Sequence, residues 1–127
     1  MNRVLATFAG LTGIGLIAFG FYAIAATTAV TDLTALTPQG VAGLNEARAI
    51  YAGSFWAMGA LILHALARPR ERHPVLLAVG VIFAGFVVAR FVSIAMDGYD
   101  PVLAPAIASE LVAALVLILA SRTMARH

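Results

Sequence analysis

The sequence predicts an all-α integral membrane protein, an up-down bundle of four transmembrane helices. Of its 127 residues, 62% are apolar and only 11% are charged, whereas a soluble domain has about 25% charged residues. The apolar residues form four runs near the roughly 20 residues that a helix needs to cross the hydrocarbon core of a bilayer. These crossings use almost the whole chain, so we expect a single membrane domain over residues 1–127.

The four predicted helices cover residues 4–26, 45–66, 74–96 and 105–122. The first could be mistaken for a signal peptide, because Arg3 precedes it and Ala23-Ile24-Ala25 resembles a cleavage site. Its apolar run exceeds the usual length of about 7 to 15 residues, so we expect a retained helix. In the connection that follows, VTDLTAL predicts a short amphipathic helical turn before Pro38 and Gly40.

Asn45 predicts the start of the second helix, because asparagine is a favourable N-cap. Glu46 then falls in the first turn, where a carboxylate interacts favourably with the helix dipole, whereas Arg48 has the wrong sign for that position. In the fourth helix, Pro105 is expected in the first turn, where proline is tolerated.

Small residues recur on one face of each of the first two helices and predict close packing. The first face contains Ala6, Gly10 and Gly13, and the second contains Ala49, Gly53 and Ala57. Such faces let helix backbones approach closely in lipid. They serve contacts within one bundle or, alternatively, a contact between two protomers.

The arginines predict the orientation of the bundle. Four crossings place both termini and the second connection on one side, where six arginines occur, namely Arg3, Arg68, Arg70, Arg72, Arg122 and Arg126. The other two connections contain no Lys or Arg and hold Asp32, Asp97 and Asp100. By the positive-inside rule both termini are expected to be cytoplasmic.

Two charges are expected to pair inside the bundle. Arg90 lies seven residues before Asp97, which places it roughly 10 Å below the outer end of the third helix. Glu110 lies about 8 Å below the outer end of the fourth helix if Pro105 occupies its first turn. Because the two depths match and a guanidinium suits a carboxylate, Arg90 and Glu110 are the preferred buried ion pair.

Further polar residues are expected near this pair. An Arg48 to Asp97 bridge would neutralise two charges that oppose their helix dipoles. Ser93 lies on the same side of the third helix as Arg90, and Tyr51 follows Arg48 by three residues. The predicted polar cluster, structural or ligand-binding, comprises Asn45, Glu46, Arg48, Tyr51, Arg90, Ser93, Asp97 and Glu110, with the first connection as its lid.

The stretches GLNEARAIYAG and RFVSIAMDG, with a later glutamate in the last helix, resemble a family of small bacterial four-helix membrane proteins, domain of unknown function 4345. The likeness runs from Gly43 to Ala120, with Ala52 where a second glycine is expected. It implies that the polar cluster acts as a unit and that the protein resides in the bacterial inner membrane, but it supplies no reaction. In architecture alone the chain also resembles DoxX-like proteins, and fold likeness does not carry function.

Enzyme chemistry is not expected. The sequence contains no paired nucleophile and base, no phosphate loop between a strand and a helix, and no two-histidine helix motif. It contains no cysteine. His64 and His73 could meet across the second connection, but we expect an interfacial role for both, and no metal or cofactor.

Two functional interpretations remain. The first is an accessory or scaffolding subunit of a larger membrane complex, and the second is binding or transport of a small molecule or ion through the polar cluster. The near balance of charges within the cluster favours the structural interpretation. The expected partners are the bilayer and a membrane protein or a second copy of the chain; a net charge of +2 does not predict nucleic-acid binding.

Overall fold

The computed structural model describes residues 3–124, so Arg126 lies outside the described residues. Within this range the chain is helical, with short connections. Four spans are long and apolar enough to cross a membrane, judged by length and composition: Arg3–Ala25, Gly40–Ala67, Arg72–Asp97 and Pro101–Thr123. The predicted all-α fold with four such helices is confirmed.

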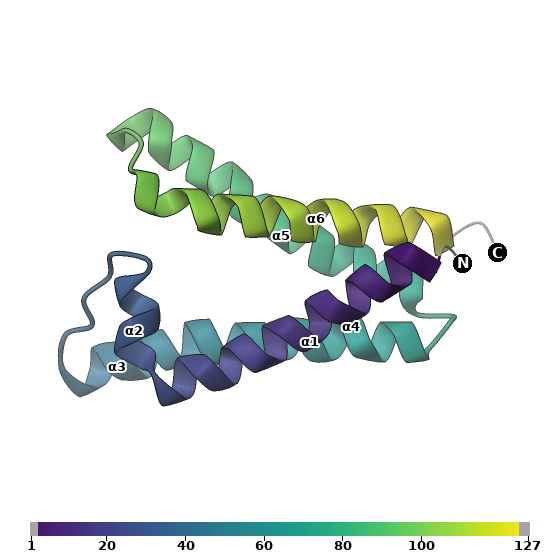
Figure 1. Ribbon diagram of the computed structural model, residues 1–127, viewed down its shortest axis with the longest axis horizontal. Helices are drawn as coiled ribbons and strands as arrows, with labels where there is room; N and C mark the ends of the chain where they lie inside the picture. The colour runs from purple at the N-terminus through teal and green to yellow at the C-terminus, as the bar shows by residue number, and fades with distance from the viewer. Residues whose placement is uncertain (1–2, 125–127) are drawn as a thin grey trace.

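The four spans form two antiparallel hairpins (Figure 1). In the first, α1 (Arg3–Ala25) packs against α4 (Ser54–Ala67), and in the second, α5 (Arg72–Asp97) packs against α6 (Ala104–Met124). The start of α1, the connection from α4 to α5 and the end of α6 lie together at one end, here called the basic end. At the opposite end, the open end, the two hairpins diverge (Figure 1).

The hydrophobic core explains this shape. One buried cluster joins both hairpins in the half nearer the basic end: Ala9, Met58, Ile62, Ala65, Leu76, Val79, Phe83, Ala113, Ala114, Leu117 and Ala120. In α5 no residue after Val87 is buried, and in the described part of α6 none before Ala113 is buried. Apolar packing therefore holds the two hairpins together only in the half nearer the basic end.

The second apolar span begins at Gly40, five residues earlier than predicted. It is a continuous helix made of α3 (Gly40–Arg48), the π-helical segment η1 (Ala49–Gly53) and α4. Its N-cap is Gln39, so the prediction of Asn45 as N-cap is wrong, and Glu46 and Arg48 lie beyond the first turn. Gly40 has a φ of +60°, a conformation open to glycine that lets the chain turn directly from Pro38 into the helix.

The close approach of α1 to α4 involves only part of the predicted small faces. Gly13 is buried, and a methyl group at Gly59 would lie 2.6 Å from the Gly13 carbonyl oxygen. The predicted packing face of Ala49, Gly53 and Ala57 is instead exposed, with no atom within 4 Å of a methyl group built at Gly53. The contacting glycine lies further along the helix than predicted.

Short helices shape the two connections at the open end. The expected turn in the first connection is present as α2 (Thr27–Asp32), slightly earlier than VTDLTAL, and it packs on α3. In the connection between α5 and α6, the 3-10 helix η2 (Pro101–Leu103) has Asp100 as its N-cap, and the Asp100 carboxylate accepts a hydrogen bond from the Val102 amide at 2.9 Å. Pro105 lies in the first turn of α6, as predicted.

Candidate functional site

Arg90 of α5 and Glu110 of α6 form a two-pronged ion pair. The Arg90 Nε donates to Glu110 Oε2 at 2.6 Å, and Nη2 donates to Oε1 at 2.7 Å. Their side chains remain 26% and 14% exposed. The pairing predicted from equal helix depths is therefore confirmed, in the planar geometry that makes arginine a strong partner for a carboxylate.

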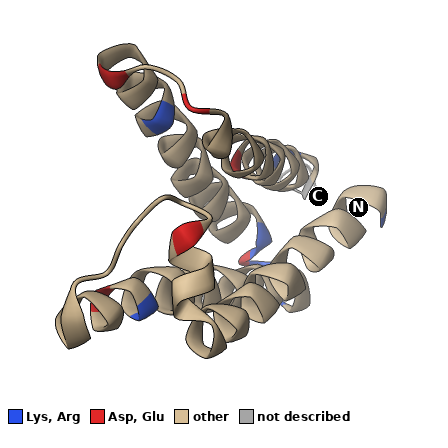
Figure 2. Ribbon diagram, turned by 60° about the vertical axis from the view of Figure 1, so that its left-hand side comes forward, with Lys and Arg blue, Asp and Glu red and all other residues tan. Residues whose placement is uncertain are grey.

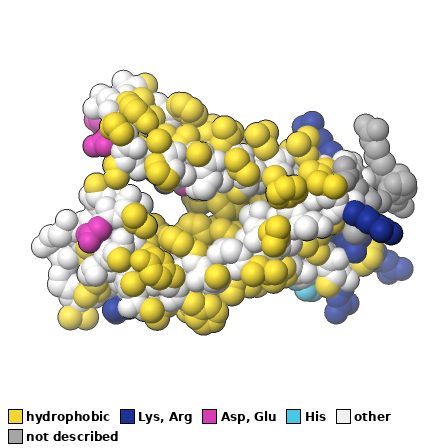
Figure 3. All heavy atoms as spheres, in the orientation of Figure 1, with side chains coloured by type: hydrophobic (Ala, Val, Ile, Leu, Met, Phe, Trp, Pro, Cys, Tyr) yellow, Lys and Arg dark blue, Asp and Glu magenta, His cyan; other side chains and the backbone are white. Residues whose placement is uncertain are grey.

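A pocket of about 290 Å³ lies beside this pair, between the hairpins. It is lined by Ile50, Tyr51, Ser54, Phe55, Met58, Phe86, Ala89, Arg90 and Glu110. These residues come from η1, α4, α5 and α6, and the space-filling view shows the hollow between the hairpins toward the open end (Figure 3). The pocket is thus a gap left where the apolar core ends.

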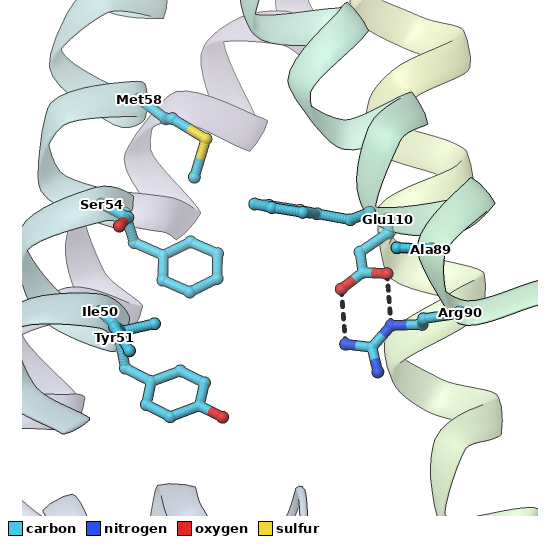
Figure 4. A pocket seen from close by; sticks show the side chains of 9 residues that line it. Ile50, Tyr51, Ser54, Met58, Ala89, Arg90 and Glu110 are labelled. Atoms are coloured by element: carbon cyan, nitrogen blue, oxygen red, sulfur yellow. Dashed lines mark hydrogen bonds and ion pairs between the residues drawn. The ribbon is translucent and has the colours of Figure 1, made fainter. Parts of the chain in front are cut away.

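The pair leaves hydrogen-bond donors facing this space. Figure 4 shows the third guanidinium nitrogen of Arg90 turned away from Glu110, on the side where the hairpins part. Among the described residues, no hydrogen-bond partner is found for this nitrogen, and Nη2 has a second N–H. The Ser54 and Tyr51 side chains lie across the gap from the pair (Figure 4). The pocket is apolar in most of its wall and rich in donors at one point.

Tyr51 connects the pocket to the first connection. Its hydroxyl lies 3.0 Å from Thr34 Oγ1, just after α2. Ile50 and Tyr51 both belong to η1, and π-helical turns are frequent at functional sites. The segment predicted as a lid therefore contacts a residue that lines the pocket.

Arg48 does not reach Asp97, so the predicted bridge between them is wrong. Arg48 Nε donates to Thr27 Oγ1 at 3.0 Å, and Thr27 in turn donates to the Ala23 carbonyl at 2.8 Å. Among the described residues, Asp97 takes part in no ion pair. The reason is the divergence of the hairpins, which places the charges of α3 and those at the end of α5 on opposite sides of the gap (Figure 2).

Five members of the predicted cluster do not line the pocket, and Arg48 is one of them. Asn45, Glu46, Ser93 and Asp97 are exposed and do not line it. Arg90, Glu110 and Tyr51 are the members brought together. The sequence interpretation did not predict the apolar side chains that line the pocket. The spacing offered a signal, because Ile50, Ser54 and Met58 recur every four residues and share a helix face with Tyr51 and Phe55.

The histidines do not meet. His64 Nε2 lies 2.7 Å from Glu71 Oε2, and His73 Nδ1 lies 3.0 Å from the Ser121 carbonyl oxygen. The sequence interpretation overlooked Glu71 as a carboxylate near His64. Across the described residues, no three His, Cys, Asp or Glu side chains gather as metal ligands.

Fold and site together define a four-helix protein of two apolar hairpins with an ion pair beside a pocket. The chain belongs to the family described as domain of unknown function 4345, whose model matches residues 4–121. No curated protein and no solved structure matches it. The likeness to DoxX-like proteins stays an analogy of architecture.

Proposed function

We propose that the protein is a multi-pass protein of the bacterial inner membrane that binds a small amphipathic molecule in the pocket between its hairpins. The observation that carries this proposal is the Arg90 guanidinium, which lines a mostly apolar pocket and keeps N–H groups without a partner among the described residues. A purely structural pair needs no such pocket. Small-molecule sites combine an apolar wall with a few placed polar groups.

The surface supports the membrane assignment. Large apolar side chains are exposed along all four spans, among them Phe8, Leu61, Phe91 and Leu115. A surface of this extent is unusual for a protein surrounded by water, because soluble monomers rarely expose large contiguous apolar patches. With Arg3, Arg68, Arg70 and Arg122 at the basic end, the positive-inside rule places that end in the cytoplasm and the pocket in the outer half of the bilayer.

The dimensions of the pocket suit part of a lipid-like molecule. A volume of about 290 Å³ lies at the lower limit of the roughly 300 to 1,000 Å³ typical of small-molecule sites. The exposed Ile50, Ser54 and Ala89 lie at its margin. A polar head and the first part of a chain fit inside, and the rest of the chain lies along the apolar surface.

The test fills the pocket with a larger side chain and leaves both residues of the ion pair unchanged. Ala89→Trp places a large side chain in the pocket wall, and Ala78→Trp, at an exposed position of the same helix nearer the basic end, is the matched control. Native mass spectrometry of protein extracted in mild detergent should show a small bound molecule on the parent and on Ala78→Trp, and not on Ala89→Trp. Equal occupancy in all three proteins, or none in the parent, contradicts the proposal.

An accessory subunit of a larger membrane complex is the second proposed function. Exposure of the small-residue face formed by Ala49, Gly53 and Ala57 favours it, because such faces allow close helix contact in lipid. Co-migration of the parent with a larger complex in mild detergent, lost in Gly53→Leu, supports this function. A small monodisperse particle for both proteins counts against it.

A further inference from the structure

We infer that the pocket recognises an uncharged head group bearing a carbonyl oxygen, rather than an anion or a cation. The inference rests on the proposed function, because it assigns the chemistry of the molecule that the pocket binds. It follows from the charge of the pocket and from the donors and acceptors that its walls leave unused.

The pocket wall carries no net charge. Among its nine lining residues, Arg90 and Glu110 are the charged ones, and they neutralise each other through two hydrogen bonds. An anionic head group bound to Arg90 Nη1, the guanidinium nitrogen that does not contact Glu110, would also lie close to the Glu110 carboxylate. Two like charges at such close range repel each other.

The unused groups of the ion pair are donors, whereas Tyr51 already donates its one O–H to Thr34 Oγ1, because Thr34 donates its own to the Thr31 carbonyl. Arg90 retains N–H groups on Nη1 and Nη2, and Tyr51 and Ser54 bring hydroxyls from the other hairpin. Both Glu110 oxygens already accept from Arg90. An ammonium head would face the positive guanidinium. A carbonyl oxygen accepts from Arg90 without bringing a charge into the pocket.

The aromatic and aliphatic walls fit the remainder of such a molecule. Phe55, Met58 and Phe86 continue from the ion pair toward the basic half, where the apolar core begins. These side chains offer contacts to an alkyl chain and no hydrogen bonds. The pocket therefore has hydrogen-bond donors at one point and an apolar wall beside it, which match the polar head group and the alkyl chain of an amphiphile.

The experiment compares three probes that share one hydrocarbon chain. Radiolabelled methyl oleate, oleate and oleylamine are added to the detergent-purified full chain, at a pH where oleate is ionised and oleylamine is protonated, and the retained probe is measured. We expect methyl oleate to bind about tenfold more tightly than either charged probe, because each charged head meets a like charge of the Arg90–Glu110 pair. Ala89→Trp should remove this binding, and Ala78→Trp should keep it.

A second pair of variants tests the donors. Tyr51→Phe should leave methyl oleate binding within about twofold of the parent, because the Tyr51 O–H is donated to Thr34 and the carbonyl accepts from Arg90. This variant also loses the contact with Thr34, so Thr34→Val is the control, which removes that contact and leaves the Tyr51 hydroxyl in place. We expect Thr34→Val to bind methyl oleate at least as well as the parent.

The outcomes distinguish the proposal that the pocket binds an amphiphile from the inference that the head group of this amphiphile is uncharged. Equal or tighter binding of oleate or oleylamine, sensitive to Ala89→Trp, overturns the uncharged head and leaves amphiphile binding intact. A loss of about fivefold or more in Tyr51→Phe that Thr34→Val does not share also overturns it, because the head group is then held by the Tyr51 hydroxyl rather than by Arg90. Failure to retain any probe, or binding that Ala89→Trp does not affect, overturns both proposals.

Discussion

Arg90 and Glu110 are joined by two hydrogen bonds of 2.6 and 2.7 Å, and both residues belong to the same helical hairpin. The pair fastens α5 to α6 near the open end, where apolar packing in this hairpin is sparse. It makes no hydrogen bond to the described residues of the α1–α4 hairpin. The strongest polar contact of the site therefore rigidifies one wall of the pocket and leaves the gap between the walls open.

Removing one partner of this pair should destabilise the folded bundle. Arg90→Leu leaves the Glu110 carboxylate without its donors, at an expected cost of about 1 to 3 kcal/mol in the free energy of unfolding. The value lies below the 3 to 5 kcal/mol typical of fully buried pairs, because Arg90 stays 26% exposed. Thermal unfolding in detergent measures the effect.

The matched double variant distinguishes a lost ion pair from lost packing. Arg90→Leu with Glu110→Leu removes both charges, and we expect its stability to return close to that of the parent. Arg90→Lys retains the charge but not the second hydrogen bond, so it should fall between the parent and Arg90→Leu. An Arg90→Leu protein as stable as the parent contradicts an energetic role for the pair.

The hydrogen bond from Arg48 to Thr27 should make a smaller contribution. Thr27→Val keeps the shape of the buried side chain and removes the hydroxyl that accepts from Arg48. Because Arg48 is exposed and regains water, we expect a loss of about 1 kcal/mol in unfolding free energy. Thr12→Val is the control, since Thr12 makes the same intrahelical bond, to the Phe8 carbonyl. Equal effects of the two changes would show that the Arg48 contact contributes nothing.

The close approach of α1 and α4 predicts opposite outcomes at two glycines of the same crossing. Gly59→Ala forces a methyl group to 2.6 Å from the Gly13 carbonyl oxygen, and we expect a loss of about 1 to 3 kcal/mol from overpacking. Gly53→Ala meets open space and should be neutral or stabilise by up to about 1 kcal/mol. Unfolding in detergent compares them, and a larger loss at Gly53 would contradict the packing described above.

The fold could be predicted because apolar run length and the bilayer set the number of helices. Depth along a helix could also be predicted, since the rise per residue is constant, and this identified Arg90 and Glu110 as partners. Both inferences depend on position along the helix axes alone.

Lateral arrangement could not be predicted in the same way. The Arg48 to Asp97 bridge required two hairpins to meet at the open end, and their separation depends on where the core stops, a property of packing between segments distant in the sequence. The π-helical segment at Ala49–Gly53 has no clear signature in the residues. The error over Asn45 was local: Gly40 allowed the helix to begin earlier.

The orientation of the bundle can be tested directly, because the chain contains no cysteine. Single cysteines at exposed positions, Pro69→Cys at the basic end and Thr37→Cys or Tyr99→Cys at the open end, leave every arginine unchanged. If the arginines hold the basic end in the cytoplasm, a membrane-impermeant maleimide applied to intact spheroplasts should label positions 37 and 99 and spare position 69. Position 69 should react once the membrane is permeabilised. Labelling of position 69 alone in intact spheroplasts would show the opposite orientation, with the pocket in the cytoplasmic half of the bilayer. Labelling of only one of positions 37 and 99 would contradict a topology in which both hairpins cross the membrane.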